Sequence, residues 1–211
     1  MTVDSAADVR AVARTYFEDA SPAHDWRHVR RVERLATRLA ADRDDVDERV
    51  LELAVYLHDI GRSREADGRI EDHAAWGARE ARDVLAAFPD ETVEAVCHCI
   101  RSHRYSTDVE PETVEARLLS DADNLDAIGA VGIARAFTHG GEFGQPIHPD
   151  RSDSESDAAG TSLEHIESKL LSLRERMYTD AGRRVANERH AFVESYLDRL
   201  ERELAGADSI D

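Results

Sequence analysis

Residues 53–62 read LAVYLHDIGR, an apolar stretch that ends in a histidine, an aspartate and a glycine. The hydrophobic residues predict a buried helix, and Gly61 is a suitable place for that helix to open. His58 and Asp59 can then turn toward one point, where a neutral imidazole and a carboxylate suit a divalent cation of borderline or hard character. An adjacent His-Asp pair carries little weight alone, because many such pairs are exposed polar neighbours.

Two further segments strengthen the metal hypothesis. Upstream stands HDWRHVRRV, in which His28 lies on the helix that follows Ser21 and Pro22. Downstream stands LLSDADNLDAIGA, where three aspartates interrupt an otherwise apolar helix. Those aspartates are Asp121, Asp123 and Asp126. Buried carboxylates are costly without a counter-charge, and a metal ion supplies one.

The hydrophobic periodicity indicates an all-α fold. Apolar residues recur with the 3.6-residue period of amphipathic helices through most of the chain, and Leu163, Ile166, Leu170 and Leu173 mark one such helix. Because no segment shows convincing strand alternation, we expect roughly nine helices in a single domain over residues 1–211. Residues from about 139 to 161 are rich in Gly, Pro, Ser and Asp. They predict a flexible loop, which either covers an active site or is a surface loop without a function.

These segments together resemble the HD superfamily of metal-dependent phosphohydrolases, whose pattern is a histidine, a His-Asp doublet and a distant aspartate, all on helices. The resemblance implies an HD-domain helical bundle. It also implies four metal ligands, namely His28, His58, Asp59 and Asp123. Asp123 matches the last ligand because family members commonly carry Ala-Asp there, as Ala122 and Asp123 do here. Asp121 is a less favoured ligand, and Asp126 is expected to orient a ligand or cap a turn.

The resemblance extends from about residue 25 to residue 201. DADNLDAIGAVGIARAFTHGG and HIESKLLSLRERMYTDAGRRVANERHAFVESYL are similar to the small YedJ-like branch of bacterial and archaeal HD proteins. The implied cofactor is a divalent ion (Mn, Mg, Fe, Ni or Zn), with one site expected and a second left open. The implied substrate is a small phosphorylated molecule, preferably a nucleotide, of which a phosphate ester or anhydride is cleaved. The alternatives are a phosphodiesterase acting on a cyclic nucleotide or RNA, and a non-catalytic regulatory module.

Four residues are expected to serve catalysis, namely Asp59, Arg62, His73 and His103. In HD proteins with two metals, histidines such as His73 and His103 complete a second site; otherwise they contact phosphate or water, or are solvated or core histidines. Some nucleotidases carry Glu where Arg62 stands, and a guanidinium there suits phosphate oxygens. The general base stays open among Glu65, Asp72 and Asp25.

Lys169 and His165 are expected to bind substrate. Of the 27 lysines and arginines, only Lys169 is a lysine, so it is a candidate phosphate contact, and His165 precedes it by one helical turn. The alternative is an exposed lysine on a solvated helix face. Cys97 and Cys99 are interpreted as buried small residues, because a structural zinc site needs four ligands and no further cysteine exists.

The composition limits which binding partners and which cellular location are expected. A formal net charge of -18 disfavours long nucleic acid. Acid-rich, lysine-poor chains resemble proteins of salt-loving archaea, where molar salt screens carboxylate repulsion; an acidic protein from a GC-rich genome is the alternative. The N-terminus lacks the pattern of a signal peptide and no apolar run reaches the length of a membrane span, so we expect a cytoplasmic protein without a membrane partner. A homodimer stays open.

Overall fold

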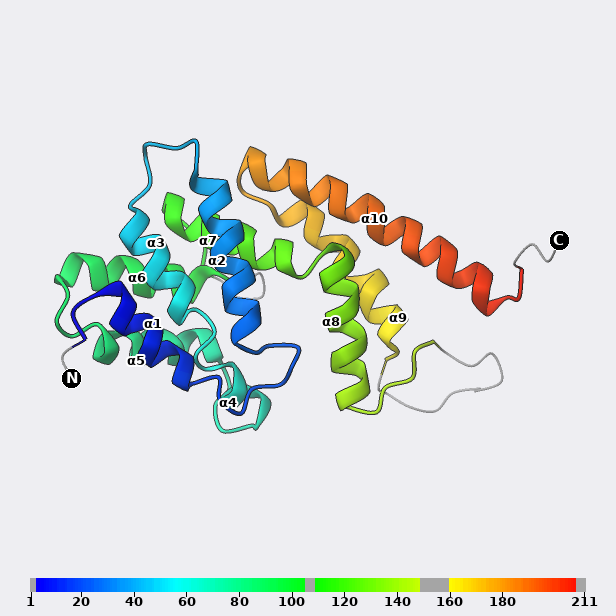
Figure 1. Ribbon diagram of the computed structural model, residues 1–211, viewed down its shortest axis with the longest axis horizontal. Helices are drawn as coiled ribbons and strands as arrows, with labels where there is room; N and C mark the ends of the chain where they lie inside the picture. The colour runs from blue at the N-terminus through cyan, green and yellow to red at the C-terminus, as the bar shows by residue number, and fades with distance from the viewer. Residues whose placement is uncertain (1–2, 105–108, 149–159, 208–211) are drawn as a thin grey trace. The chain divides into compact units, whose positions relative to one another are not determined.

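The computed structural model describes residues 3–104, 109–148 and 160–207. Within these ranges the chain forms ten α-helices, one π-helical segment (η1), one 3-10 segment (η2) and no strand (Figure 1). The all-α prediction is therefore confirmed. The bounds are α1 Ala6–Thr15, α2 Trp26–Ala40, α3 Glu48–Leu57, α4 Arg62–Ala66, α5 His73–Val84, α6 Asp90–Ser102, α7 Val114–Asp126, α8 Gly129–Glu142, α9 Ser162–His165, η1 Ile166–Leu170, η2 Leu171–Arg176 and α10 Asp180–Leu204.

The chain divides into two compact units, residues 1–123 and residues 124–211, which are described separately. The expectation of a single domain stays a prediction. α8 continues through Glu142, so the loop predicted from about residue 139 begins after that helix. Residues 149–159 of the predicted loop lie outside the described residues.

In the first unit, α3 is the central helix. It packs against α1, α2, α5 and α6, and α5 packs along α6. All residues from Leu53 to Leu57 are buried, which explains why the second half of this helix is apolar on every side. Its start is fixed by Asp47, whose carboxylate accepts hydrogen bonds from the backbone N–H groups of Arg49 and Val50. The apolar run thereby delivers its final His-Asp pair into the interior.

In the second unit, α8 packs against α9, η1 and α10. The segment predicted as one helix around Leu163 to Leu173 is divided into α9, η1 and η2, because its hydrogen-bond spacing changes along its length. α9 begins with a capping box, in which Thr161 accepts from the Glu164 N–H and the Glu164 carboxylate accepts from the Thr161 N–H.

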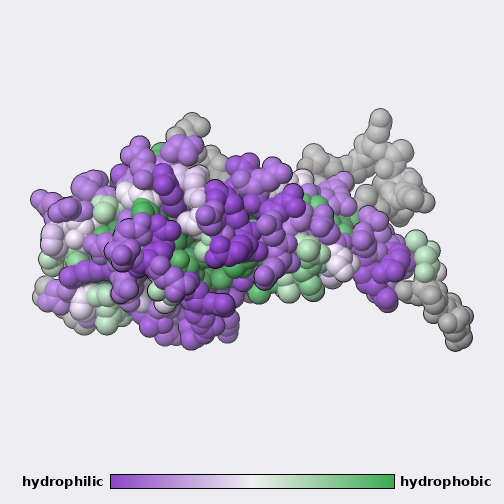
Figure 2. All heavy atoms as spheres, turned by 90° about the horizontal axis from the view of Figure 1, so that it is seen from above, coloured by the Kyte–Doolittle hydropathy of each residue, from purple (hydrophilic) through white to green (hydrophobic). Residues whose placement is uncertain are grey.

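The surface is largely polar. Hydrophilic residues, drawn purple, cover most of the face shown in Figure 2. No helix among the described residues is long and apolar enough to cross a membrane.

Candidate metal centre

Two helices end in a histidine that turns back on its own last turn. His58 caps the C-terminus of α3 and His103 that of α6. The Nδ1–H of His58 donates to the Val55 carbonyl over 2.8 Å, and that of His103 donates to the Ile100 carbonyl over 2.7 Å. The last carbonyls of a helix lack intrahelical donors, so each ring satisfies one of them. Since a carbonyl can only accept, Nδ1 carries the proton and each neutral ring presents an Nε2 lone pair.

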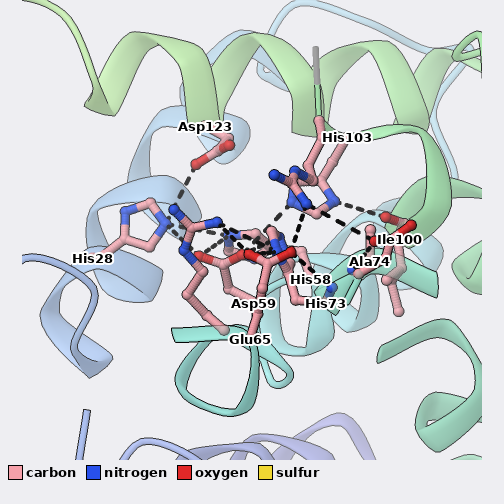
Figure 3. Close-up of polar contacts among 12 residues, drawn as sticks. His28, His58, Asp59, Glu65, His73, Ala74, Ile100, His103 and Asp123 are labelled. Atoms are coloured by element: carbon pink, nitrogen blue, oxygen red, sulfur yellow. Dashed lines mark hydrogen bonds and ion pairs between the residues drawn. The ribbon is translucent and has the colours of Figure 1, made fainter. Parts of the chain in front are cut away.

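The carboxylate of Asp59 lies among four imidazoles (Figure 3). Its Oδ2 is 3.5 Å from His28 Nε2 and 3.9 Å from His58 Nε2. Its Oδ1 is 3.1 Å from His73 Nε2 and 3.6 Å from His103 Nε2. Asp59 is 6% exposed and the four histidines are buried. Two buried groups suited to a metal ion therefore share this one residue.

Asp123 reaches the same cluster from α7. Its Oδ1 lies 3.3 Å from His28 Nε2, and its side chain is 26% exposed (Figure 3). Of the neighbouring aspartates, Asp121 is fully buried. Asp126, which the sequence suggested as a ligand-orienting or turn-capping residue, forms a buried ion pair with Arg135, with 2.9 Å between Oδ2 and Nη1, and its suggested role stays a prediction. The structure thus brings together the four residues that the resemblance implied as ligands.

The donor set fits a divalent cation. Two atoms bound to one ion at about 2.1 Å lie about 3.0 Å apart in octahedral and about 3.4 Å apart in tetrahedral geometry. His28 Nε2 is 3.3 Å from both His58 Nε2 and Asp123 Oδ1, which matches that spacing. His73 Nε2 is buried and makes no hydrogen bond, although Asp59 lies beside it. A cation between these lone pairs would remove their mutual repulsion.

The ionisation states of His58 and Asp59 favour such a site, whereas that of His103 favours a bound proton. Burial lowers the pKa of His58 to about 4, despite the opposing charges of Asp59 and Asp123, so this ring is neutral at pH 7. Burial raises the pKa of Asp59, but the neighbouring histidines, His58 foremost, lower it more and hold it well below its usual value. The pKa of His103 is raised, because Asp59 and Asp123 outweigh the lowering effect of burial. A neutral imidazole facing an ionised carboxylate is the form that binds metal.

Arg62 lies next to this cluster but first contacts Glu65. Its Nη1 is 3.0 Å from Glu65 Oε2 and 3.3 Å from His73 Nδ1. Arg104 contacts the other carboxylate oxygen of Glu65, with 2.9 Å between Nη1 and Oε1. Arg104 is not among the residues predicted from the sequence. The available signal was its position directly after a histidine at a helix end.

The three candidate general bases all have structural partners. Asp25 is the N-cap of α2 and accepts from the Arg27 N–H. Asp72 is the N-cap of α5 and accepts from the N–H groups of Ala74 and Ala75. Glu65 binds His73 as well as the two arginines. Each carboxylate therefore already holds part of the local structure in place.

The other predicted residues lie away from the cluster in sequence. Lys169 in η1 and His165 in α9 are both half-buried and belong to the second unit, so their contact with substrate stays a prediction. Burial lowers the pKa of His165, and the positive charges of Lys169 and His139 lower it further. Cys97 and Cys99 are free and buried, as predicted.

An all-helical chain with a buried cluster of histidines and aspartates defines a metal-binding class of helical protein. The HD domain family model matches residues 25–128, a range that includes His28, Asp59, His103 and Asp123. The YpgQ protein of Bacillus subtilis (strain 168) is 33% identical over 210 residues, which cover 97% of this chain and 96% of that protein. The chain therefore belongs to the HD-domain superfamily of hydrolases and is YpgQ-like.

Solved structures show the same fold. The crystal structure of Bacillus subtilis YpgQ in complex with ADP has a TM-score of 0.74 at 31% identity, covering 97% of this chain and 100% of that one. A protein of Lactobacillus plantarum has a TM-score of 0.77 at 26% identity, covering 96% and 97%. An HD-superfamily hydrolase of Bacillus thuringiensis has a TM-score of 0.73 at 28% identity, covering 97% and 99%. The YedJ-like branch and the halophilic source stay predictions.

Proposed function

We propose that the protein is a metal-dependent phosphohydrolase that cleaves a phosphate ester or anhydride of a nucleotide. The observation that carries the proposal is the buried Asp59 carboxylate, which has histidine nitrogens within 4 Å of both oxygens. Nucleotide as the substrate class is supported by the similar YpgQ, whose crystal structure was determined in complex with ADP.

The residues of the cluster have distinct proposed roles. His28, His58, Asp59 and Asp123 hold one divalent ion among Mn, Mg, Fe, Ni and Zn. At such a site the ion supplies two effects, a lower pKa of a water molecule and neutralisation of charge on phosphoryl oxygens.

The remaining candidate residues are proposed to bind a second metal ion or the substrate. Asp59, His73 and His103 are the candidates for a second ion, because Asp59 presents its other oxygen to them. Arg62 binds phosphate oxygens through its planar guanidinium. Lys169 and His165 stay candidate substrate contacts in the second unit.

A second candidate function is phosphodiester cleavage on a cyclic nucleotide or RNA. Two His/Asp groups that share Asp59 favour it, since paired metal sites stabilise both the attacking and the leaving oxygen of a displacement at phosphorus. The formal net charge of -18 disfavours long RNA, so a cyclic or short substrate is preferred within this alternative.

The test is the release of phosphate and pyrophosphate from a panel of nucleotides, cyclic nucleotides and simple phosphate esters. The reactions contain Mn²⁺ in high potassium chloride, with an EDTA control and the variant Asp59→Asn. Asp83→Asn is the matched control, because Asp83 is exposed and its substitution changes the charge equally. Release that requires metal, survives Asp83→Asn and vanishes in Asp59→Asn is the expected result.

The other outcomes separate the alternatives. Products from cyclic nucleotides alone would favour the phosphodiesterase. No release from folded, metal-binding protein would favour a non-catalytic regulatory module. Release that is unchanged in Asp59→Asn would overturn the assignment of the metal centre.

A further inference from the structure

Glu65, on the short helix α4, accepts four hydrogen bonds. Its Oε2 accepts from His73 Nδ1 over 2.8 Å and from Arg62 Nη1 over 3.0 Å. Its Oε1 accepts from the His73 backbone N–H over 3.2 Å and from Arg104 Nη1 over 2.9 Å (Figure 3 shows Glu65 beside His73). An ionised carboxylate offers about four lone-pair sites, so every acceptor position is used. Glu65 is therefore poorly suited to take a proton from water.

The contact with His73 determines which nitrogen of that ring carries the proton. His73 Nδ1 lies 2.8 Å from Glu65 Oε2, which can only accept, and 3.3 Å from Arg62 Nη1, which can only donate. The shorter contact assigns the proton to Nδ1, so the neutral ring turns the Nε2 lone pair toward Asp59 Oδ1, 3.1 Å away. Metal-ligating histidines commonly donate their other N–H to a carboxylate or carbonyl, which fixes the tautomer. His58 and His103 use backbone carbonyls for this purpose, whereas His73 uses a charged side chain.

The contacts with the arginines bring together two cations from distant parts of the sequence. Arg62 is the first residue of α4, and Arg104 follows the C-cap of α6. Their side chains are 26% and 28% exposed, so both guanidinium groups are reachable from solvent. Two guanidiniums anchored on one carboxylate, beside the His73 ring, are well suited to bind phosphate oxygens.

We propose that Glu65 is a positioning residue, which fixes the tautomer of His73 and holds Arg62 and Arg104 as a pair that binds phosphate. The proposal deepens the proposed function, on which it rests, because the phosphate is that of the substrate. It adds Arg104 to the site and assigns Glu65 a role other than general base.

The first test measures the tautomer of His73 by nitrogen-15 NMR of the imidazoles in EDTA-treated protein, in which no ion holds His73 Nε2. In the wild type we expect the proton on Nδ1. In Glu65→Gln the new amide can donate to Nδ1, so we expect a shift of the proton toward Nε2. Glu71→Gln is the matched control, because Glu71 is exposed and its substitution removes the same charge. Circular dichroism confirms that each variant is folded.

The second test measures the binding of inorganic phosphate to Mg²⁺-loaded protein by calorimetry. Arg62→Gln and Arg104→Gln should each weaken binding roughly 10- to 100-fold, as expected for the loss of a charged hydrogen-bond donor. Arg38→Gln, at an exposed position of α2, should leave it unchanged. Glu65→Gln should weaken it because the arginines lose their anchor. If Glu65→Gln fails to fold, Arg104→Gln at the rim still tests the arginine pair.

The outcomes separate this proposal from the proposed function. An unchanged His73 tautomer in Glu65→Gln overturns the first part, and phosphate binding unchanged in Arg104→Gln, or absent in the wild type, overturns the second. A wild-type protein that hydrolyses nothing, but shows both effects, would refute the hydrolase and support Glu65 as the positioning residue of a phosphate-binding site.

Discussion

Metal binding should depend on pH through His103 and not through His58. A metal ion competes with protons for each histidine ligand. A histidine of ordinary pKa, about 6.5, is about 3% neutral at pH 5, which weakens metal binding about 30-fold relative to pH 8. His58, with a pKa of about 4, stays about 90% neutral at pH 5, so its protonation weakens metal binding only about 1.1-fold. The pKa of His103 is raised, so its protonation at pH 5 should weaken metal binding by more than about 30-fold.

The carboxylate ligands do not obscure this difference. The pKa values of Asp59 and Asp123 both lie below the usual value, because the neighbouring histidines outweigh the raising effect of burial. Both side chains are therefore ionised throughout the range from pH 5 to pH 8. Lowering the pH adds a proton to His103 before His58, so metal affinity should fall first for an ion bound near His103.

Calorimetric titration with Mn²⁺ at pH 8 and pH 5 checks this expectation. The wild type should lose more than about 30-fold in affinity for one ion. In His103→Ala the loss of affinity between pH 8 and pH 5 should become smaller, whereas His58→Ala should weaken binding by a similar factor at both pH values. Equal steepness in His103→Ala and the wild type, with circular dichroism showing a folded variant, would refute the reasoning.

Three further predictions concern the surroundings of the site and the surface charge. Arg135→Met should lower the free energy of unfolding by about 3–5 kcal/mol in urea titrations, because it leaves the buried Asp126 carboxylate without its counter-charge; adding Asp126→Leu should recover part of the loss, and a loss below about 1 kcal/mol would argue against a buried pair. Asp25→Asn and Asp72→Asn should keep most nucleotide hydrolysis, because asparagine caps helices as well as aspartate does; loss of turnover with the fold intact would make that residue a general base. Raising potassium chloride from about 0.1 M to about 2 M should raise the melting temperature, because salt screens the repulsion behind a net charge of -18; an unchanged melting temperature would count against the halophilic interpretation.

The helical fold and the proximity of His58 and Asp59 were predictable because they depend on local sequence. An apolar run that ends in His-Asp-Ile-Gly specifies a buried helix with its polar pair at the end, whatever surrounds it. The position of Asp123 came from a family resemblance, since nothing local distinguishes it from Asp121. Its contact with His28 joins residues 28 and 123 and depends on how α2 and α7 pack.

The partners of Glu65 were not predictable from local sequence. Arg104 is 39 residues away along the chain, and an arginine at a helix end is normally interpreted as a solvated residue. The contact forms because α4 lies against the start of α5 and α5 packs along α6, which brings the end of α6 within reach of Glu65. The π-helical hydrogen bonding of η1 was likewise not predictable from the sequence, because its apolar residues keep a spacing compatible with an ordinary α-helix.

The three candidate general bases share a structural role, because each carboxylate accepts N–H groups that hold a helix start or a histidine ring in place. Asp25 begins the helix on which His28 lies three residues later, and Asp72 begins the helix whose first residue is His73. Glu65 then fixes the ring of His73. Asp25 and Asp72 thus fix helix starts and Glu65 fixes a histidine ring. A carboxylate that accepts backbone or imidazole N–H groups in the resting protein must break those bonds before it can accept a proton from water. In the proposed function these carboxylates place ligands, and the charge that would act on phosphate comes from the cluster and from the arginines bound to Glu65.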